Sequence, residues 1–113
     1  MYDLREHKEL ISRLVSEANQ NDENWRWSVK SVGKTKASIF WSYLEYCGQP
    51  EPYFVIELED TGDGYWIHAL DERDSYIESE IVVDNDLPFL NCPLDKAIEK
   101  MVRCIVNTAH ACY

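Results

Sequence analysis

No stretch of about 18 uncharged apolar residues, the length that spans a bilayer as a helix, occurs in this 113-residue chain. A secretory signal needs an apolar segment near the start, where the sequence MYDLREHKEL carries charges instead. We therefore expect a cytoplasmic protein with no membrane partner. In that compartment Cys47, Cys92, Cys104 and Cys112 are expected to be reduced thiols.

Glycine is also scarce, with four residues that never form the phosphate-binding patterns G-x-G-x-x-G or G-x-x-x-x-G-K-[ST]. No C-x-x-C pair occurs either. Cys104, His110 and Cys112 are close in sequence, but on a helix Cys104 and Cys112 lie about two turns apart. That separation is too large for one zinc ion unless the helix end unwinds. We expect no metal and no cofactor.

Basic residues are nearly absent from residues 45–86, which hold thirteen acids and only one base, Arg73. The flanking segments, 1–44 and 87–113, each carry one net positive charge, so the middle is more negative than the chain as a whole, whose net charge is -10. Four basic residues near Trp25 and Trp27 could attract nucleic-acid phosphates only weakly, because the acidic middle of the chain repels them. The sequence therefore predicts no direct binding to nucleic acid.

Helical periodicity appears at both ends of the chain. Near the N-terminus, apolar residues form one stripe from about Leu4 to Asn19, and Asp3 followed by Glu6 has the spacing of a capping box. A second stripe runs from Leu94 to Cys112, directly after Pro93, which suits a first helical turn. Two amphipathic helices are therefore predicted, one at each end.

Between the helices the apolar residues alternate with a period of two, as they do in half-buried strands. The predicted strands are 25–29, 37–47, 53–59, 65–70 and, as the fifth, 76–83. Apolar residues on both faces of 37–47 indicate a central strand. Turn sequences such as DTGDG connect neighbouring strands directly, and so short a connection requires antiparallel pairing.

The predicted fold class is α+β, with one domain over residues 1–113. An antiparallel meander of four to five strands carries the N-terminal and C-terminal helices on one face, in the order α-β-β-β-β(-β)-α. The other face of the sheet is left to water or to a partner. We expect the acids of the third to fifth strands to gather on that exposed face.

The pattern of acids disfavours both a calcium loop and a catalytic pair. Placing Gly64 or Gly62 at position 6 of a calcium loop puts Leu70 or His68 at position 12, where a glutamate is required. Paired carboxylates with His68 nearby could act in acid–base catalysis, but the sequence gives no sign of a closed pocket. We expect no catalytic residues and no metal site, so that His68 is a partly buried or surface residue of the sheet.

Crowding like charges on neighbouring strands weakens a sheet, which favours a use for the acids beyond solubility. Aromatic residues among the acids are typical anchors of protein interfaces. We therefore expect a basic protein as partner, such as a nucleic-acid-binding effector or a nuclease. The predicted partner-binding residues are Glu57, Glu59, Asp60, Asp63, Tyr65, Trp66, Asp71, Glu72, Asp74, Tyr76, Glu78 and Glu80.

In size, acidity and lack of a catalytic signature the chain resembles small acidic inhibitors, namely anti-CRISPR and anti-restriction proteins and the immunity proteins of bacterial toxins. The resemblance implies a non-enzymatic inhibitor that acts by nucleic-acid mimicry or site blocking, as a monomer or homodimer. Toxin immunity, a small hydrolase or metal-dependent enzyme, and a housekeeping domain with a solvated acidic face are the alternatives that remain open.

Overall fold

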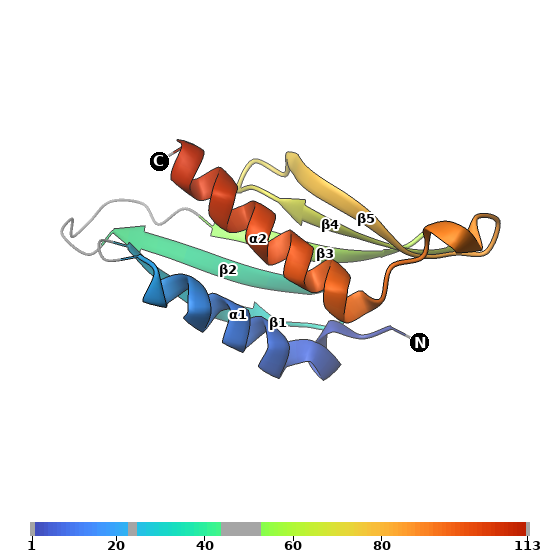
Figure 1. Cartoon of the computed structure of the whole chain (residues 1–113), viewed down its shortest axis with the longest axis horizontal. Coiled ribbons are helices and arrows are strands. Elements are labelled where there is room, and N and C mark those ends of the chain that lie inside the picture. Colours follow the sequence, from blue (N-terminus) through green and yellow to red (C-terminus); the bar gives the residue numbers. More distant parts are fainter. Residues whose placement is uncertain (1, 23–24, 44–52, 113) are drawn as a thin grey trace.

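The computed structural model describes residues 2–22, 25–43 and 53–112, and it shows two helices and one five-stranded sheet (Figure 1). The elements are η1 (Leu4–His7), α1 (Lys8–Gln20), β1 (Trp25–Val32), β2 (Lys36–Tyr43), β3 (Tyr53–Asp60), β4 (Gly64–Leu70), β5 (Tyr76–Asp84), η2 (Pro88–Leu90) and α2 (Leu94–Cys112). The predicted extension of the second strand through residues 44–47, and the turn after it, lie outside the described residues.

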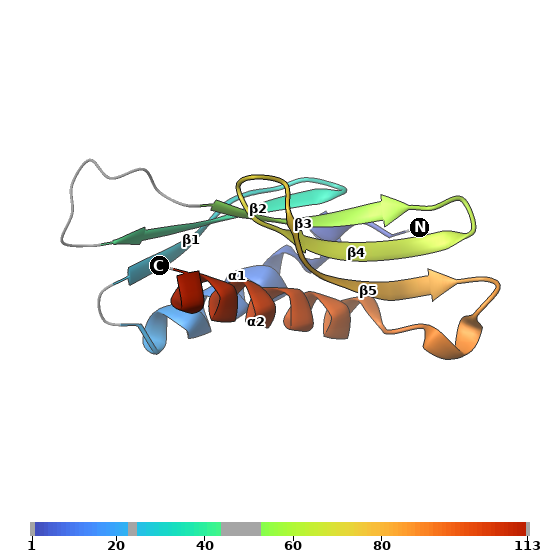
Figure 2. The same cartoon turned by 90° about the horizontal axis from the view of Figure 1, so that it is seen from above.

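The sheet is an antiparallel meander in the order β1-β2-β3-β4-β5, so each strand pairs with its neighbours in sequence. Figure 2 shows both helices on the same side of this sheet. The predicted α+β class, the element order and the central position of the second strand are confirmed. Among the described residues, no helix combines the length and apolarity needed to cross a membrane.

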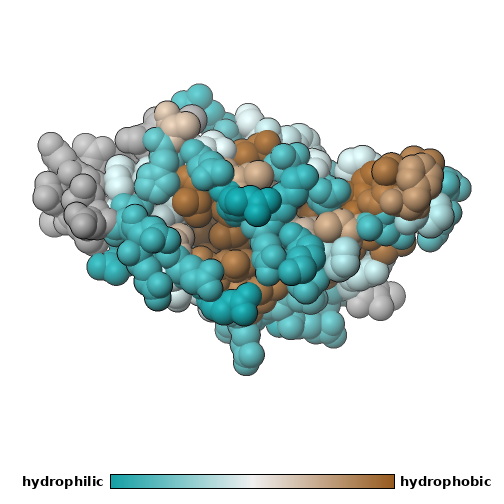
Figure 3. Space-filling view, viewed as in Figure 1, coloured by the Kyte–Doolittle hydropathy of each residue, from teal (hydrophilic) through white to brown (hydrophobic). Residues whose placement is uncertain are grey.

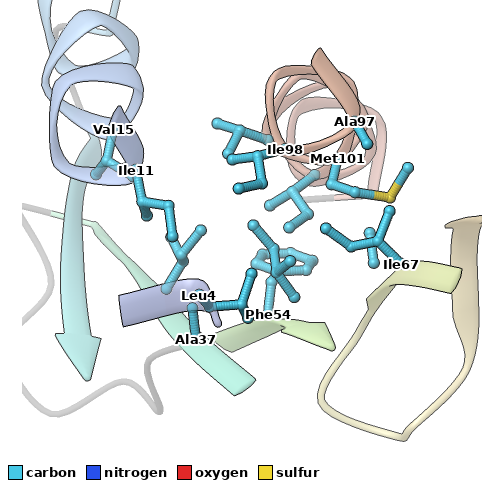
Figure 4. Close-up of a cluster of buried hydrophobic side chains, with 14 of the residues drawn as sticks. Leu4, Ile11, Val15, Ala37, Phe54, Ile67, Ala97, Ile98 and Met101 are labelled. Carbon is cyan, nitrogen blue, oxygen red and sulfur yellow. The ribbon is translucent and has the colours of Figure 1, made fainter. Parts of the chain in front are cut away.

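The core lies between the helices and one face of the sheet (Figure 4). From the sheet, Trp27 and Trp41 stack with ring centroids 5.3 Å apart, and Phe54 packs beside Trp27. From the helices, Ile11 and Ile98 are fully buried. Alternation along each strand turns the intervening residues to the opposite face, which neither α1 nor α2 covers (Figure 2). We call that opposite face the open face.

The free edge of β1 is covered by α1. The side-chain amide of Asn19 donates to the carbonyl oxygen of Trp27 at 2.9 Å and accepts from its backbone N–H at 2.6 Å. Both outward-pointing backbone groups of Trp27 are thereby satisfied. An edge strand blocked in this way is a poor template for pairing with another chain.

The N-terminal helix begins differently from the sequence prediction. Leu4–His7 forms a 3₁₀ turn, and the α-helix starts only at Lys8. Asp3 does cap the segment, because its Oδ1 accepts from the Arg5 backbone N–H at 2.9 Å. The same carboxylate also accepts from the Arg5 guanidinium, with Nη2 and Oδ2 2.7 Å apart. A 3₁₀ turn is a common opening for an α-helix.

The Asp3–Arg5 pair should make the free energy of unfolding depend on pH in the acid range. The hydrogen bonds from the Arg5 side chain hold the pKa of Asp3 at about 2, below its ordinary 3.8. The stability that this pair adds is fully present above pH 3.8 and is lost as the pH falls to about 2. We expect Asp3→Asn to lower the free energy of unfolding at neutral pH, and urea unfolding at several pH values should show the difference from wild type shrinking to zero in acid. A difference that stays constant into acid would contradict this.

Candidate functional site

The open face of β3 and β4, together with the turn between β4 and β5, forms the most acidic surface of the described chain, and we call it the acidic sheet face. Strand pairing places Glu57 opposite His68 and Glu59 opposite Trp66, so these side chains point away from the helices. Its members from the predicted set are Glu57, Glu59, Trp66, Asp71, Glu72, Asp74 and Tyr76.

Aromatic rings lie among these carboxylates. Tyr76 leaves 67% of its surface exposed and meets His68 edge to face, with ring centroids 4.8 Å apart. Trp66 stacks on the other side of His68 at 6.3 Å. The Tyr53 hydroxyl donates to the Glu72 carbonyl oxygen at 3.4 Å, which ties β3 to the turn. The acidic sheet face is therefore a half-buried aromatic strip with charged residues around it.

The expectation that all acids of β3 to β5 gather on the open face is wrong for β5. Glu78 pairs with Ala69 and Glu80 with Ile67, and both partners belong to the core on the helix side. The Glu80 carboxylate accordingly meets the Lys100 ammonium of α2 at 2.7 Å. Tyr65 also turns inward and packs edge to face on Tyr2, with ring centroids 4.9 Å apart.

Glu78 and Glu80 have a structural use at the sheet edge. Oε1 of Glu78 accepts from the backbone N–H of Ser79 at 3.0 Å, and Oε1 of Glu80 accepts from that of Ile81 at 3.3 Å. The Cys92 backbone N–H donates to the Ile81 carbonyl oxygen at 2.9 Å. β5 is the second edge strand, so these bonds occupy groups that another chain would otherwise use.

Two further acids hold turns. Asp60 Oδ1 accepts from the Gly62 backbone N–H at 2.9 Å, and Gly62 has φ of 87°, which favours glycine. Asp71 Oδ1 accepts from the backbone N–H groups of Arg73 and Ser75 at 2.9 Å and 3.0 Å. Asp63 lies in the same β3–β4 turn as Gly62, at the end of these strands opposite the β4–β5 turn.

His68 occupies the centre of a hydrogen-bonded array. It is 7% exposed, with Nε2 2.8 Å from Glu59 Oε2 and Nδ1 2.6 Å from Ser79 Oγ. A carboxylate only accepts, so with neutral imidazole Nε2–H donates to Glu59 and the Ser79 hydroxyl donates to Nδ1. Sequence reasoning placed His68 in the sheet but missed both partners, which come from the two neighbouring strands.

The array has the composition of a nucleophile, a base and a carboxylate, but its surroundings suit a structural role better. Acyl transfer requires backbone N–H donors free to bind a developing oxyanion. The Ser79 and Ile81 N–H groups already bond to Glu78 and Glu80. Trp66 and Tyr76 pack against the imidazole where a substrate would have to enter. The geometry therefore ties three strands together at one point.

Of the three residues that suggested zinc, the side chains of Cys104 and His110 are described. Within the described part of the chain, no group of three His, Cys, Asp or Glu residues could hold a metal ion. His110 Nε2 lies 3.3 Å from Asp22 Oδ2, and its ring packs edge to face on Trp41. Cys92 and Cys104 are free thiols, and burial raises the pKa of Cys92. The side chain of Cys112 lies outside the described residues.

Comparison with known protein families, with curated proteins and with solved structures gives no match to this chain. The class that the coordinates define is an α+β meander with two helices on one face of the sheet.

Proposed function

We propose that this chain is a non-enzymatic binding protein that docks its acidic sheet face on a basic protein. The observation that carries the proposal is the exposed ring of Tyr76 held against His68, on which Trp66 also stacks. Glu57, Glu59 and the acids of the β4–β5 turn belong to the same face. Exposed aromatics anchor interfaces, and a surrounding set of charges steers association and fixes orientation.

The inferred partner is a nucleic-acid-processing protein, because such a protein presents a basic groove whose charge is complementary to a row of carboxylates. Docking there would inhibit it by nucleic-acid mimicry or by blocking its site. The structural uses found for Asp71, Glu78 and Glu80 make these three acids poor candidates for recognition. We infer that Glu57, Glu72 and Asp74 contribute the recognition charge, and of these Glu57 also lies 4.0 Å from the Lys36 ammonium. The free thiols Cys92 and Cys104 support a cytoplasmic location.

Neutralising three acids of the face tests the proposal. We expect Glu57→Gln, Glu72→Gln and Asp74→Asn together to weaken capture of the partner about tenfold, mainly through a slower association rate. Asn is used at residue 74 because that backbone has φ of 61°, a region that Asn tolerates. Asp71 is left unchanged because its carboxylate holds the turn. The measurement is binding kinetics at low and high salt with the protein retained from a host lysate.

The matched control removes the same charge from the helix side. Glu6→Gln, Glu9→Gln and Asp95→Asn change three exposed acids that lie across the sheet from the acidic sheet face. This control should keep nearly all of the affinity. Equal losses in the two triple variants would show that only net charge matters, and unchanged binding in the first would overturn the proposal.

Identification of the retained protein separates the alternatives. A nuclease or effector released by added nucleic acid supports mimicry, whereas a toxin whose capture is insensitive to nucleic acid indicates an immunity protein. The Ser79–His68–Glu59 array is the one observation that favours a hydrolase. Turnover of an ester, phosphate or glycoside substrate that is lost in Ser79→Ala would replace the binding proposal by that activity.

A further inference from the structure

The segment between β5 and α2 exposes large apolar side chains. Leu87 is 41% exposed, Phe89 79% and Leu90 43%, and we call these three residues the apolar knuckle. They make the brown projection at the right of Figure 3. Three bulky apolar side chains within four residues are more than the scattered exposure that is normal for a protein surface.

Hydrogen bonds fix the knuckle in place. Asp84 Oδ1 accepts from the backbone N–H groups of Asp86 and Leu87 at 2.9 Å and 3.1 Å. The Leu90 backbone N–H donates to the Leu87 carbonyl oxygen at 3.0 Å, and Asn91 Oδ1 accepts from the Asp84 N–H at 2.8 Å. A preorganised apolar projection loses little conformational freedom on docking, which is what an interface anchor requires.

An apolar groove lies between α1 and α2, with a volume of about 410 Å³. Its floor is formed by Leu14, Ala18, Val102 and Val106. Its rim carries Arg13 and Arg103 together with Glu17 and Glu99. The volume of this groove falls within the range of pockets that bind small molecules. The groove and the knuckle are both visible on the helix-covered side of the molecule (Figure 3).

We propose that two copies of this chain associate through these surfaces, the knuckle of each copy entering the helix groove of the other. Charge favours a second copy over an unrelated occupant. Asp84 and Asp86 flank the knuckle. In the groove, Arg13 already pairs with Glu17 and Glu99 at 3.8 Å and 4.0 Å. Arg103 makes no ion pair within the described part of the chain, so it is the lining base that would meet the two aspartates of the second copy. The acidic excess of the chain is concentrated in 45–86, whereas α1 has two acids and two bases and α2 has two acids and three bases. Two copies can therefore meet helix side to helix side without apposing their acidic sheet faces.

The arrangement has two-fold symmetry. Because the knuckle lies at one end of the molecule and the groove between the helices, turning one copy end for end above the other brings each knuckle over the opposite groove (Figures 1 and 3). Such an isologous contact closes as a dimer and does not propagate into a fibre. The acidic sheet face stays outside this contact, so dimerisation is independent of the partner proposed for that face.

Analytical ultracentrifugation over a wide range of protein concentration tests the proposal. We expect a reversible monomer–dimer equilibrium, and we expect Phe89→Ala to raise the dimer dissociation constant about 30-fold, as loss of a central aromatic anchor does. Tyr76→Ala is the matched control, because Tyr76 is also an exposed aromatic but lies on the open face. Its dissociation constant should equal that of the wild type. A monomer at every concentration overturns the proposal.

Complementation distinguishes a knuckle-in-groove contact from a contact between two knuckles. Ala18→Lys places an ammonium in the groove floor but leaves the knuckle intact. Neither this variant nor Phe89→Ala should dimerise well alone. An equimolar mixture should form heterodimers, because one intact knuckle then meets one intact groove. If the mixture associates no better than Phe89→Ala alone, the groove is not the receptor and the proposal fails, provided that circular dichroism shows both variants folded.

Discussion

Replacing Phe54 by alanine should lower the free energy of unfolding by about 3–5 kcal/mol, the range found for emptying an aromatic site in a core. Phe54 is 1% exposed and lies among side chains from both helices and the sheet (Figure 4). It packs on Trp27 with ring centroids 6.1 Å apart and pairs with Ile39 across β2 and β3. Because these neighbours belong to a rigid sheet, they cannot close the cavity. Urea unfolding followed by tryptophan fluorescence measures the loss.

The same substitution at Phe89 is the control for Phe54→Ala. Phe89 is 79% exposed, so its removal should change the unfolding free energy by less than about 0.5 kcal/mol. The comparison must be made at protein concentrations where the monomer predominates, since dimer formation would stabilise the wild type. A large loss at Phe89 in the monomer would show that the knuckle is part of the folded core. It would then remove the basis for treating it as an interface.

The fold could be predicted from sequence because its determinants are local. The stripe that includes Ile11 and Val15, and the one that includes Ile98 and Met101, identify helices by spacing alone, and all four residues are buried as expected. Strict alternation along 53–59 identified β3 to within one residue. Short turns then left antiparallel pairing as the only connection. The 3₁₀ opening at Leu4–His7 was missed, because it has the same apolar spacing as an α-helix.

The site could be predicted only in part, because it depends on which face of each strand turns inward. In β5 acidic and apolar residues interleave with no net preference, and two shifts of register disturb the alternation beside Tyr65 and Leu70. Nothing local therefore indicated that Glu80 meets Lys100 of a distant helix. The knuckle was missed for a different reason, since Phe89 lies in a connection with no periodicity. Its signal was available as an apolar cluster within an otherwise polar linker.

The acidic middle of the chain has two uses, and they must be separated before function is tested. Asp60, Asp71, Glu78 and Glu80 hold turns or protect a strand edge. Substituting them would change folding and binding together, so a loss of binding would not identify an interface. The half-buried Glu57 carboxylate lies 4.0 Å from the Lys36 ammonium, and an ion pair of this kind contributes little to stability, so substituting Glu57 should disturb the fold less.

His68→Ala is expected to lower the free energy of unfolding by about 2–4 kcal/mol, because it removes buried packing and leaves polar partners unsatisfied. The imidazole of His68 on β4 forms hydrogen bonds with Glu59 on β3 and with Ser79 on β5, so it links three adjacent strands. Trp66 and Tyr76 also lose their common neighbour. Chemical denaturation at neutral pH measures the effect. Hydrogen exchange should place the local loss of protection in β4 and β5.

A second variant decides whether the array acts in structure or in catalysis. Ser79→Ala removes only the hydroxyl that donates to Nδ1, and a structural role predicts a loss of about 1 kcal/mol. A structural array also predicts that His68→Gln, which can still donate to Glu59, recovers part of the stability lost in His68→Ala. A catalytic array predicts the opposite pattern, with near-wild-type stability in Ser79→Ala and no recovery of turnover in His68→Gln.

Because Tyr76 rests on the same imidazole, a structural array further predicts that His68→Ala weakens partner capture while Ser79→Ala leaves it nearly unchanged.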